Sequence, residues 1–165
     1  MKAGNSTFYL VGQITSDPQT YQWRKNVRDY FEGSEQLNFY DPCDNVFSQG
    51  VLKQANGNVE SFRKSASFNL VSPILPIRDA AYVLSSDGCI ANMNVYTPDK
   101  PFIGTFFELA WYKMNPEKLV IGIFNGDPKT NLICWHPFVQ SSVHLWVKDE
   151  YEACSVLQKL YCKGG

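Results

Sequence analysis

The sequence lacks a strong net charge and any long apolar run. Its 15 Lys and Arg residues nearly balance 16 Asp and Glu residues, which gives a formal net charge of −1. So weak a field offers no general attraction to nucleic acids or anionic lipids, and we expect neither as a partner. No apolar stretch approaches the roughly 20 residues that a membrane-spanning helix requires. These absences favour a small-molecule substrate.

The sequence also lacks the spacings typical of disulfide and metal sites. Its five cysteines are odd in number, widely spaced and include no C-x-x-C pair, so neither a disulfide framework nor a zinc site is expected. The two histidines, His136 and His144, show no metal-ligand pattern, and we predict structural roles for both and no cofactor. A strand expected by Phe8 leaves no room for a signal peptide, so the predicted compartment is a reducing cytoplasm.

What the chain does contain is an alternation of short apolar strands with helices. Strands are predicted at residues 8–11, 37–40, 89–96, 119–124 and 143–147. Helices are expected at 18–31, 59–70, 76–87, 104–113, 131–138 and 149–161. Residues 41–58 are expected to form a long polar loop. This alternation predicts an α/β fold, in which residues 1–165 form a single doubly wound domain with a five-stranded parallel sheet and helices on both faces, flavodoxin-like or Rossmann-like. No G-x-G-x-x-G or phosphate-loop motif is present, which disfavours dinucleotide and nucleoside-triphosphate binding.

Two carboxylates are the candidates for chemistry. Glu108 follows a strand-to-helix turn, and such a turn lies at the carboxyl edge of a parallel sheet, where open α/β folds bind ligands. Asp79 is expected near the same edge. Enzymes that cleave glycosidic bonds with retention of configuration use one carboxylate as the nucleophile and a second, protonatable group as the acid. The simpler interpretation is that Glu108 is a solvated helix position and that Asp79 faces solvent beside Arg78. The basic residues Arg24, Lys25 and Arg28 are expected on a solvated helix face.

Five segments in order resemble the nucleoside 2-deoxyribosyltransferase family, and together they span most of the chain. They are residues 7–9, 42–45, 78–79, 95–109 and 131–135. The fourth segment contains a V-Y-x-P-D loop at 95–99 and a G-x-x-x-E-L helix start at 104–109. The resemblance implies transfer of a 2-deoxyribosyl group between nucleobases, with 2′-deoxynucleosides and free bases as substrates.

The resemblance also implies a role for each matching residue. Glu108 is the nucleophile on C1′, Tyr9 holds Glu108 by a hydrogen bond, and Asp79 takes part in protonating the departing base. Asn131, near Trp135, reaches into a neighbouring subunit's site, which implies a homo-oligomer. The remaining substrate-binding positions are Gly12, Gln13, Asp44, Asn45, Asp99, Phe102 and Gly104. As a nucleophile, Glu108 is expected to be ionised at neutral pH, favoured by the helix N-terminus and by the Tyr9 hydroxyl.

Two alternative functions stay open. A related branch hydrolyses 2′-deoxynucleoside 5′-monophosphates with the same nucleophile and needs a phosphate grip, for which Arg78, Ser141 and Ser142 are candidates. The other alternative is a non-catalytic nucleotide-binding module. It is motivated by Phe102, where the family often has Asp, and by Val46, where the family has a base-contacting Gln. Phe102 could instead stack on a base.

Overall fold

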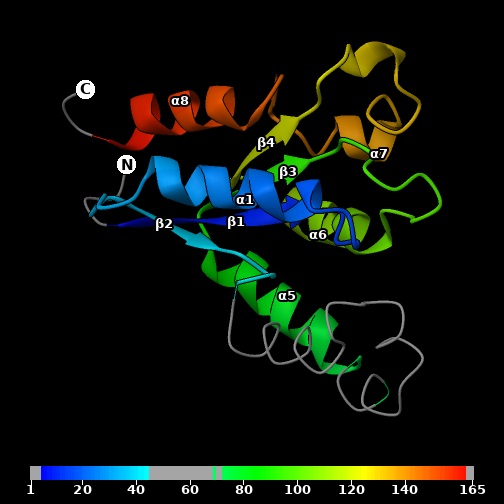
Figure 1. Cartoon of the computed structure of the whole chain (residues 1–165), viewed down its shortest axis with the longest axis horizontal. Coiled ribbons are helices and arrows are strands. Elements are labelled where there is room, and N and C mark those ends of the chain that lie inside the picture. The colour runs from blue at the N-terminus through cyan, green and yellow to red at the C-terminus, as the bar shows by residue number, and fades with distance from the viewer. Residues whose placement is uncertain (1–4, 45–68, 70–71, 163–165) are drawn as a thin grey trace.

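Five parallel strands form the centre of the molecule. The computed structural model describes residues 5–44, 69 and 72–162 (Figure 1). The strands are β1 (Ser6–Gly12), β2 (Leu37–Tyr40), β3 (Gly88–Asn92), β4 (Leu119–Ile123) and β5 (Leu145–Val147). Their order is β2-β1-β3-β4-β5, and every neighbouring pair is parallel. The predicted doubly wound α/β fold with a five-stranded parallel sheet is therefore confirmed.

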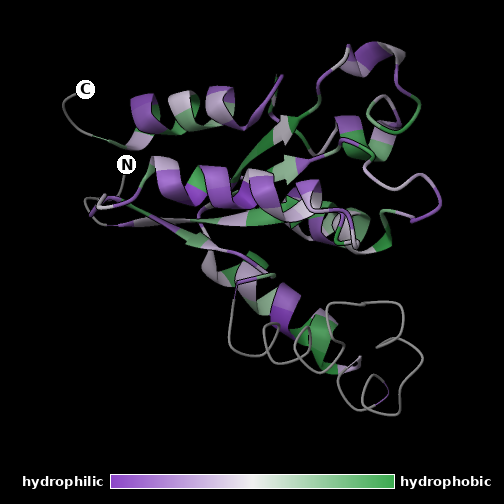
Figure 2. Cartoon of the chain, viewed as in Figure 1, coloured by the Kyte–Doolittle hydropathy of each residue, from purple (hydrophilic) through white to green (hydrophobic). Residues whose placement is uncertain are grey.

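Helices cover both faces of this sheet. Helices α1 (Gln19–Tyr30) and α8 (Glu150–Tyr161) pack against each other on one face (Figure 1). Helices α5 (Ile74–Ser85) and α6 (Ile103–Lys113) pack together on the other face, where the short α7 (Pro137–Gln140) also contacts α6. Hydrophilic residues colour much of the outward side of α1, while the strands behind it are mostly hydrophobic (Figure 2).

The alternation of side chains along β1 divides the interior into two apolar cores. Phe8 and Leu10 join the core beneath α1 and α8, whereas Tyr9 and Val11 join the core beneath α5 and α6. Successive strand residues point to opposite faces of a sheet, so this division follows directly from the sequence. It directs the Tyr9 side chain toward α6.

The start of α8 confirms the predicted helix signal there. The Asp149 side chain accepts a hydrogen bond from the backbone N–H of Glu152 at 2.8 Å, as an N-cap residue does. At α1 the residue before the helix is Pro18, and the Asp17 carboxylate accepts the N–H of Gln19 at 2.8 Å.

The strand β3 ends earlier than its sequence predicts. It stops at Asn92, so Val95 and Tyr96 belong to the following loop and do not close the strand. The Asn92 side chain explains the early end, because its Oδ1 accepts the backbone N–H of Asn94 at 3.0 Å. Asn side chains that bond a nearby backbone amide compete in this way with a regular ladder.

The helix predicted over residues 131–138 is also wrong. A 3-10 turn, η1 (Pro128–Thr130), comes first, and α7 begins only at Pro137. Proline disfavours helical dihedrals at the preceding residue, and His136 accordingly has φ −58° and ψ 131°. A helix cannot run through that junction.

Helix α5 begins at Ile74, two residues before the predicted start at Pro76.

Some predictions fall on residues that the structure does not describe. Asn45, Val46, most of the predicted loop at 41–58 and nearly all of the predicted helix at 59–70 lie outside the described residues. Within those that are described, none of the helices has the length and apolar character to span a membrane. All five cysteines are described, and their thiols are free.

Candidate active site

A cleft of about 290 Å³ lies where β1 ends and α6 begins. Its walls come from the end of β1, from the loop before α6 and from the first turns of α6, with Asp79 of α5 on a further side. This is the carboxyl edge of the parallel sheet, where the sequence predicted a site. Seven predicted site residues line it: Tyr9, Gly12, Gln13, Asp79, Phe102, Gly104 and Glu108.

The carboxyl group of Glu108 is held by the phenol of Tyr9. The Tyr9 hydroxyl donates a hydrogen bond to Glu108 Oε1 at 2.5 Å, at the short end of the range for O–H···O bonds. Tyr9 is fully buried, and Glu108 is only 7% exposed. Burial raises the pKa of the Tyr9 phenol well above its usual value, and the nearby Glu108 raises it further, so Tyr9 remains a donor at all physiological pH values.

The pKa of Glu108 is raised from 4.5 to about 8, chiefly because burial disfavours the charged form. The hydrogen bond from Tyr9 lowers that pKa and the charge of Asp79 raises it, while Arg24 and Arg78 lower it. The expectation of an ionised Glu108 at neutral pH is therefore wrong, because the raised pKa favours the neutral carboxyl group. Glu108 is the sixth residue of α6, and the favourable field of a helix N-terminus fades beyond the first turn.

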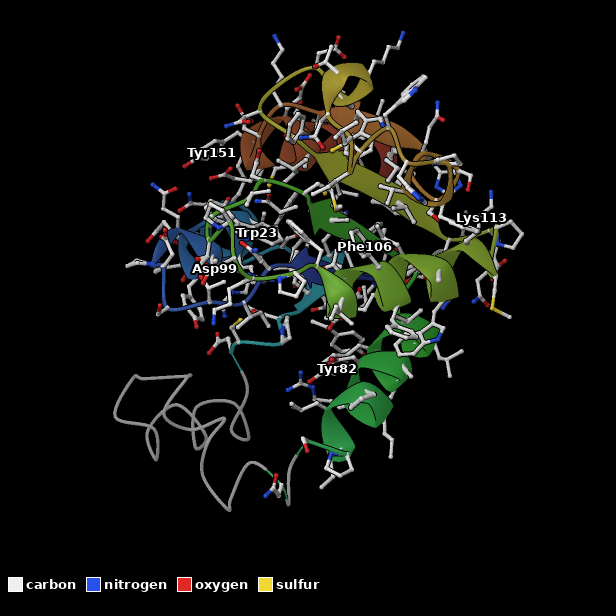
Figure 3. All side chains as sticks on the ribbon, turned by 90° about the vertical axis from the view of Figure 1, so that its right-hand side faces the viewer. Trp23, Tyr82, Asp99, Phe106, Lys113 and Tyr151 are labelled. Carbon is white, nitrogen blue, oxygen red and sulfur yellow. The ribbon has the colours of Figure 1, made fainter. Side chains whose placement is uncertain are left out.

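Asp79 faces the same cleft and is paired with its sequence neighbour. Arg78 Nε and Nη2 donate to Asp79 Oδ1 at 2.9 and 2.7 Å. Burial raises the pKa of Asp79, and the Arg78 guanidinium lowers it less than burial raises it. Tyr82, also on α5, packs its ring 5.3 Å from that of Tyr9, and Figure 3 shows it between α5 and α6. Asp79 is thus a half-buried, paired carboxylate.

The two glycines of the cleft have different surroundings. A Cβ atom at Gly12 would lie 3.0 Å from the carbonyl oxygen of Asn92, so the ends of β1 and β3 need a glycine there to approach. A Cβ at Gly104 would meet nothing within 4 Å, so space is open in front of the first turn of α6. Phe102 is buried in the core beneath α6 and borders the cleft.

Three predicted residues lie apart from this cleft. Asp44 forms an ion pair with Arg28 of α1 and lines a separate surface pocket beside that helix. Asp99 is exposed on the loop before α6, where Figure 3 labels it. Asn131 Oδ1 accepts the backbone N–H groups of Ile133 and Cys134, each at 3.0 Å, and so caps its own turn. Ser142, a candidate for a phosphate grip, donates instead to the carbonyl of Phe138 at 2.7 Å.

Arg24 is the residue that the sequence interpretation placed wrongly. It is 0% exposed, not solvated, and its guanidinium donates to the carbonyls of Leu10 at 3.3 Å and Gly12 at 3.0 Å. Further bonds reach the carbonyls of Gln13 at 3.4 Å and Thr20. The spacing in the sequence could have predicted this burial. The buried residues of α1 are spaced i, i+3, i+4 and i+7, as on one helix face, and are Thr20, Trp23, Arg24 and Val27.

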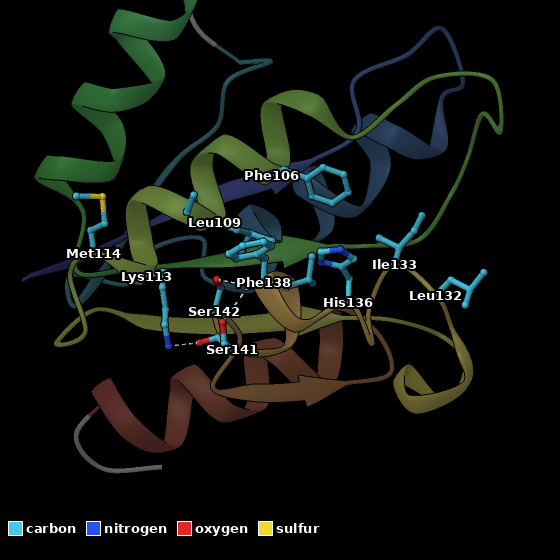
Figure 4. A pocket seen from close by; sticks show the side chains of 12 residues that line it. Phe106, Leu109, Lys113, Met114, Leu132, Ile133, His136, Phe138, Ser141 and Ser142 are labelled. Atoms are coloured by element: carbon cyan, nitrogen blue, oxygen red, sulfur yellow. Dashed lines mark hydrogen bonds between the residues drawn. The ribbon is translucent and has the colours of Figure 1, made fainter.

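A larger cavity of about 730 Å³ lies elsewhere, between α6, α7 and the preceding segment (Figure 4). Phe106, Phe138 and Leu132 are among its mostly apolar lining residues, and none of the lining residues is a carboxylate. Lys113 donates to the carbonyl of Ser141 at its edge. Carboxylate chemistry therefore belongs to the smaller cleft. No group of His, Cys, Asp or Glu side chains placed to hold a metal ion occurs among residues 5–44, 69 and 72–162.

Comparison with known proteins supports the fold and gives no information on function. No family model matches the sequence, and no curated protein matches it. A crystal structure of a conserved protein from Enterococcus faecalis V583 is similar, with a TM-score of 0.57 and 14% sequence identity. The match covers 95% of this chain and 99% of that one. At that identity the likeness shows a shared fold over nearly the whole chain.

Proposed function

We propose that the cleft cleaves the N-glycosidic bond of 2′-deoxynucleosides and transfers the deoxyribosyl group to another nucleobase. One observation carries the proposal: a buried carboxyl group, held by a phenol at 2.5 Å, shares a cleft with a second carboxyl group. Enzymes that form a covalent glycosyl intermediate use two carboxyl groups in this way, one as nucleophile and one as acid. The five family-like segments of the sequence supply the substrate class.

In the first step Glu108 attacks C1′ of the sugar in its ionised form, which is the minor form at neutral pH because the pKa of Glu108 is about 8. Tyr9 donates to Oε1, which leaves Oε2 to form the new C–O bond. The C1′–N bond breaks, its electron pair leaves with the base, and protonated Asp79 gives a proton to that base. Burial raises the pKa of Asp79, which favours the protonated form that this role needs.

In the second step a nitrogen of an incoming base attacks C1′. The C–O bond to Glu108 breaks, Glu108 leaves as a carboxylate, and the proton of the incoming base returns to Asp79. Tyr9 stabilises the charge that develops on Glu108 as this bond breaks. Neither step requires a cofactor.

Hydrolysis of 2′-deoxynucleoside 5′-monophosphates is the second candidate, with water in place of the incoming base. One feature of the cleft favours it. The first residues of α6 line the cleft without a side-chain cap, and Lys100 lies beside them. A helix N-terminus and a cation together suit a phosphate group. Ser142 bonds elsewhere, as described above, and contributes nothing to this candidate.

Product analysis separates these candidates. The purified protein would be incubated with a 2′-deoxynucleoside and a different free base, or with a 2′-deoxynucleoside 5′-monophosphate, and the products separated by chromatography. An exchanged nucleoside supports the transferase, and free base alone supports the hydrolase. Ligand binding without turnover by either substrate would refute both and favour the non-catalytic nucleotide-binding module.

We also propose that two copies of the chain associate through the apolar face beside α7. Leu132, Phe138 and Met114 line the 730 Å³ cavity and are 91%, 80% and 79% exposed (Figure 4). Single soluble chains rarely leave such a patch uncovered. Asn131 and Trp135 adjoin these residues in the sequence, where the family resemblance expects an interface.

Light scattering tests this association. The wild-type protein is expected to be at least a dimer, and Phe138→Asp is expected to shift it toward a monomer. Leu84→Ser, at an exposed apolar position on α5, is the matched control and should leave the mass unchanged. A wild-type monomer at working concentration would contradict the proposal.

The five free thiols suit a reducing cytoplasm, which we propose as the compartment.

A further inference from the structure

The side chain of Gln13 has no hydrogen-bonding capacity left for a substrate. A Gln side chain offers two N–H donors and a carbonyl oxygen with two lone pairs. In Gln13, Nε2 donates to the carbonyls of Thr97 at 3.0 Å and Lys100 at 2.6 Å. Oε1 accepts the backbone N–H groups of Tyr96 at 3.0 Å and Thr97 at 3.1 Å. All four positions are therefore occupied, and all by the segment 96–100.

This segment forms part of the cleft. It lies between β3 and α6, and Lys100 at its end lines the cleft together with Gln13 itself. Pro98 has no backbone N–H, so residues 96, 97, 99 and 100 carry the four backbone donors of the segment. Gln13 satisfies two of those donors from a buried position, which fixes the segment relative to the end of β1.

Gln13 is itself held in place from the opposite face of the sheet. The buried guanidinium of Arg24 donates to the carbonyls of Gly12 and Gln13 at 3.0 and 3.4 Å. A continuous series of bonds thus runs from α1, through the end of β1, to the loop before α6. The Tyr9–Glu108 bond lies outside this series, because its two residues bond each other directly.

We propose that Gln13 is a positioning residue, which keeps the segment 96–100 in its substrate-binding conformation and does not bind substrate through its amide. The kinetic part of this proposal rests on the proposed function. If the segment is ordered only part of the time, apparent affinity falls by that fraction, while bound substrate still meets an intact Glu108 and Tyr9. Loss of Gln13 therefore raises KM and leaves kcat nearly unchanged.

The test compares Gln13→Ala and Gln13→Met with Gln140→Ala. The Met variant keeps the side-chain length and removes all four bonds, so it serves if the Ala variant fails to fold. Gln140 is exposed on α7 and provides the control. Hydrogen exchange followed by NMR should accelerate about 10- to 100-fold at the amides of Tyr96 and Thr97 in both Gln13 variants, with that of Ile90 in β3 unchanged.

Steady-state kinetics with a 2′-deoxynucleoside complete the test. KM should rise about 10-fold in the Gln13 variants, with kcat within about threefold of wild type and the same midpoint in its pH profile. Unchanged exchange at Tyr96 and Thr97 would overturn the proposal, as would a loss confined to kcat. If the wild-type protein shows no turnover, the proposed function fails, and the exchange measurement still decides the role of Gln13.

Discussion

The raised pKa of Glu108 predicts a specific change in how stability depends on pH. The folded protein keeps a proton on Glu108 up to about pH 8, whereas the unfolded chain releases it near 4.5. The favourable contribution of the neutral carboxyl is therefore complete below pH 4.5 and is lost as pH rises toward 8. Glu108→Gln removes the titrating group, keeps the size of the side chain and leaves an oxygen for the Tyr9 hydroxyl.

The size of the effect follows from the shift. Each pH unit well between the two pKa values changes the free energy of unfolding by about 1.4 kcal/mol, and partial titration near each pKa reduces the total from pH 5 to pH 8 to about 3.5 kcal/mol. Relative to wild type, Glu108→Gln should therefore gain about 3.5 kcal/mol in free energy of unfolding over that interval. All other titrating groups are shared by the two proteins and cancel in the difference.

Urea unfolding of both proteins at pH 5, 6, 7 and 8 measures this difference. Glu117→Gln is the matched control, because Glu117 is exposed, and its difference from wild type should stay nearly constant with pH. A constant difference for Glu108→Gln as well would refute the reasoning. It would mean that the buried carboxyl ionises near its ordinary pKa, with water or the Tyr9 hydroxyl offsetting the loss of solvation.

Three further predictions concern turnover of a 2′-deoxynucleoside. Glu108→Gln should abolish formation of the covalent intermediate, detectable by mass spectrometry, while ligand binding by calorimetry persists; near-normal turnover would assign the nucleophile to another residue. Tyr9→Phe should fold normally and lose about 10- to 1000-fold in kcat, because a positioned donor to the reacting carboxylate is removed; a loss larger than that of Glu108→Gln would reverse the roles. Between pH 5 and pH 8 the wild-type rate should rise as Glu108 ionises, and it should fall at higher pH where Asp79 loses the proton that the leaving base needs; a rate that is flat from pH 5 to 8 would show that Glu108 ionises lower.

Much of the fold could be predicted from the sequence, because local patterns determine it. The alternation of strands with helices predicted the five-stranded parallel sheet, and Asp149 marked the start of α8. Two boundaries were missed for equally local reasons. The side chain of Asn92 ends β3, and Pro137 prevents a helix from passing through His136.

The site was less predictable, because burial and long-range pairing decide it. The sequence indicated Glu108 and Tyr9, yet it gave no measure of how strongly burial would raise the pKa of Glu108. Asp44, in the segment after β2, forms an ion pair with Arg28 of α1, and no pattern within either segment predicts this pair. Gln13 was expected to contact substrate, and no pattern in the sequence predicts its four hydrogen bonds to the loop, on which the proposed positioning role rests.

The division of the interior into two cores has a consequence for variation and engineering. Tyr9, Asp79 and Glu108 all belong to the face covered by α5 and α6, so the α1–α8 face can be repacked for thermal stability without changing these three residues of the cleft. Arg24 is the exception. It belongs to α1 but donates to the carbonyls of Gly12 and Gln13 beside the cleft, so a substitution of Arg24 changes the α1–α8 face and the cleft together.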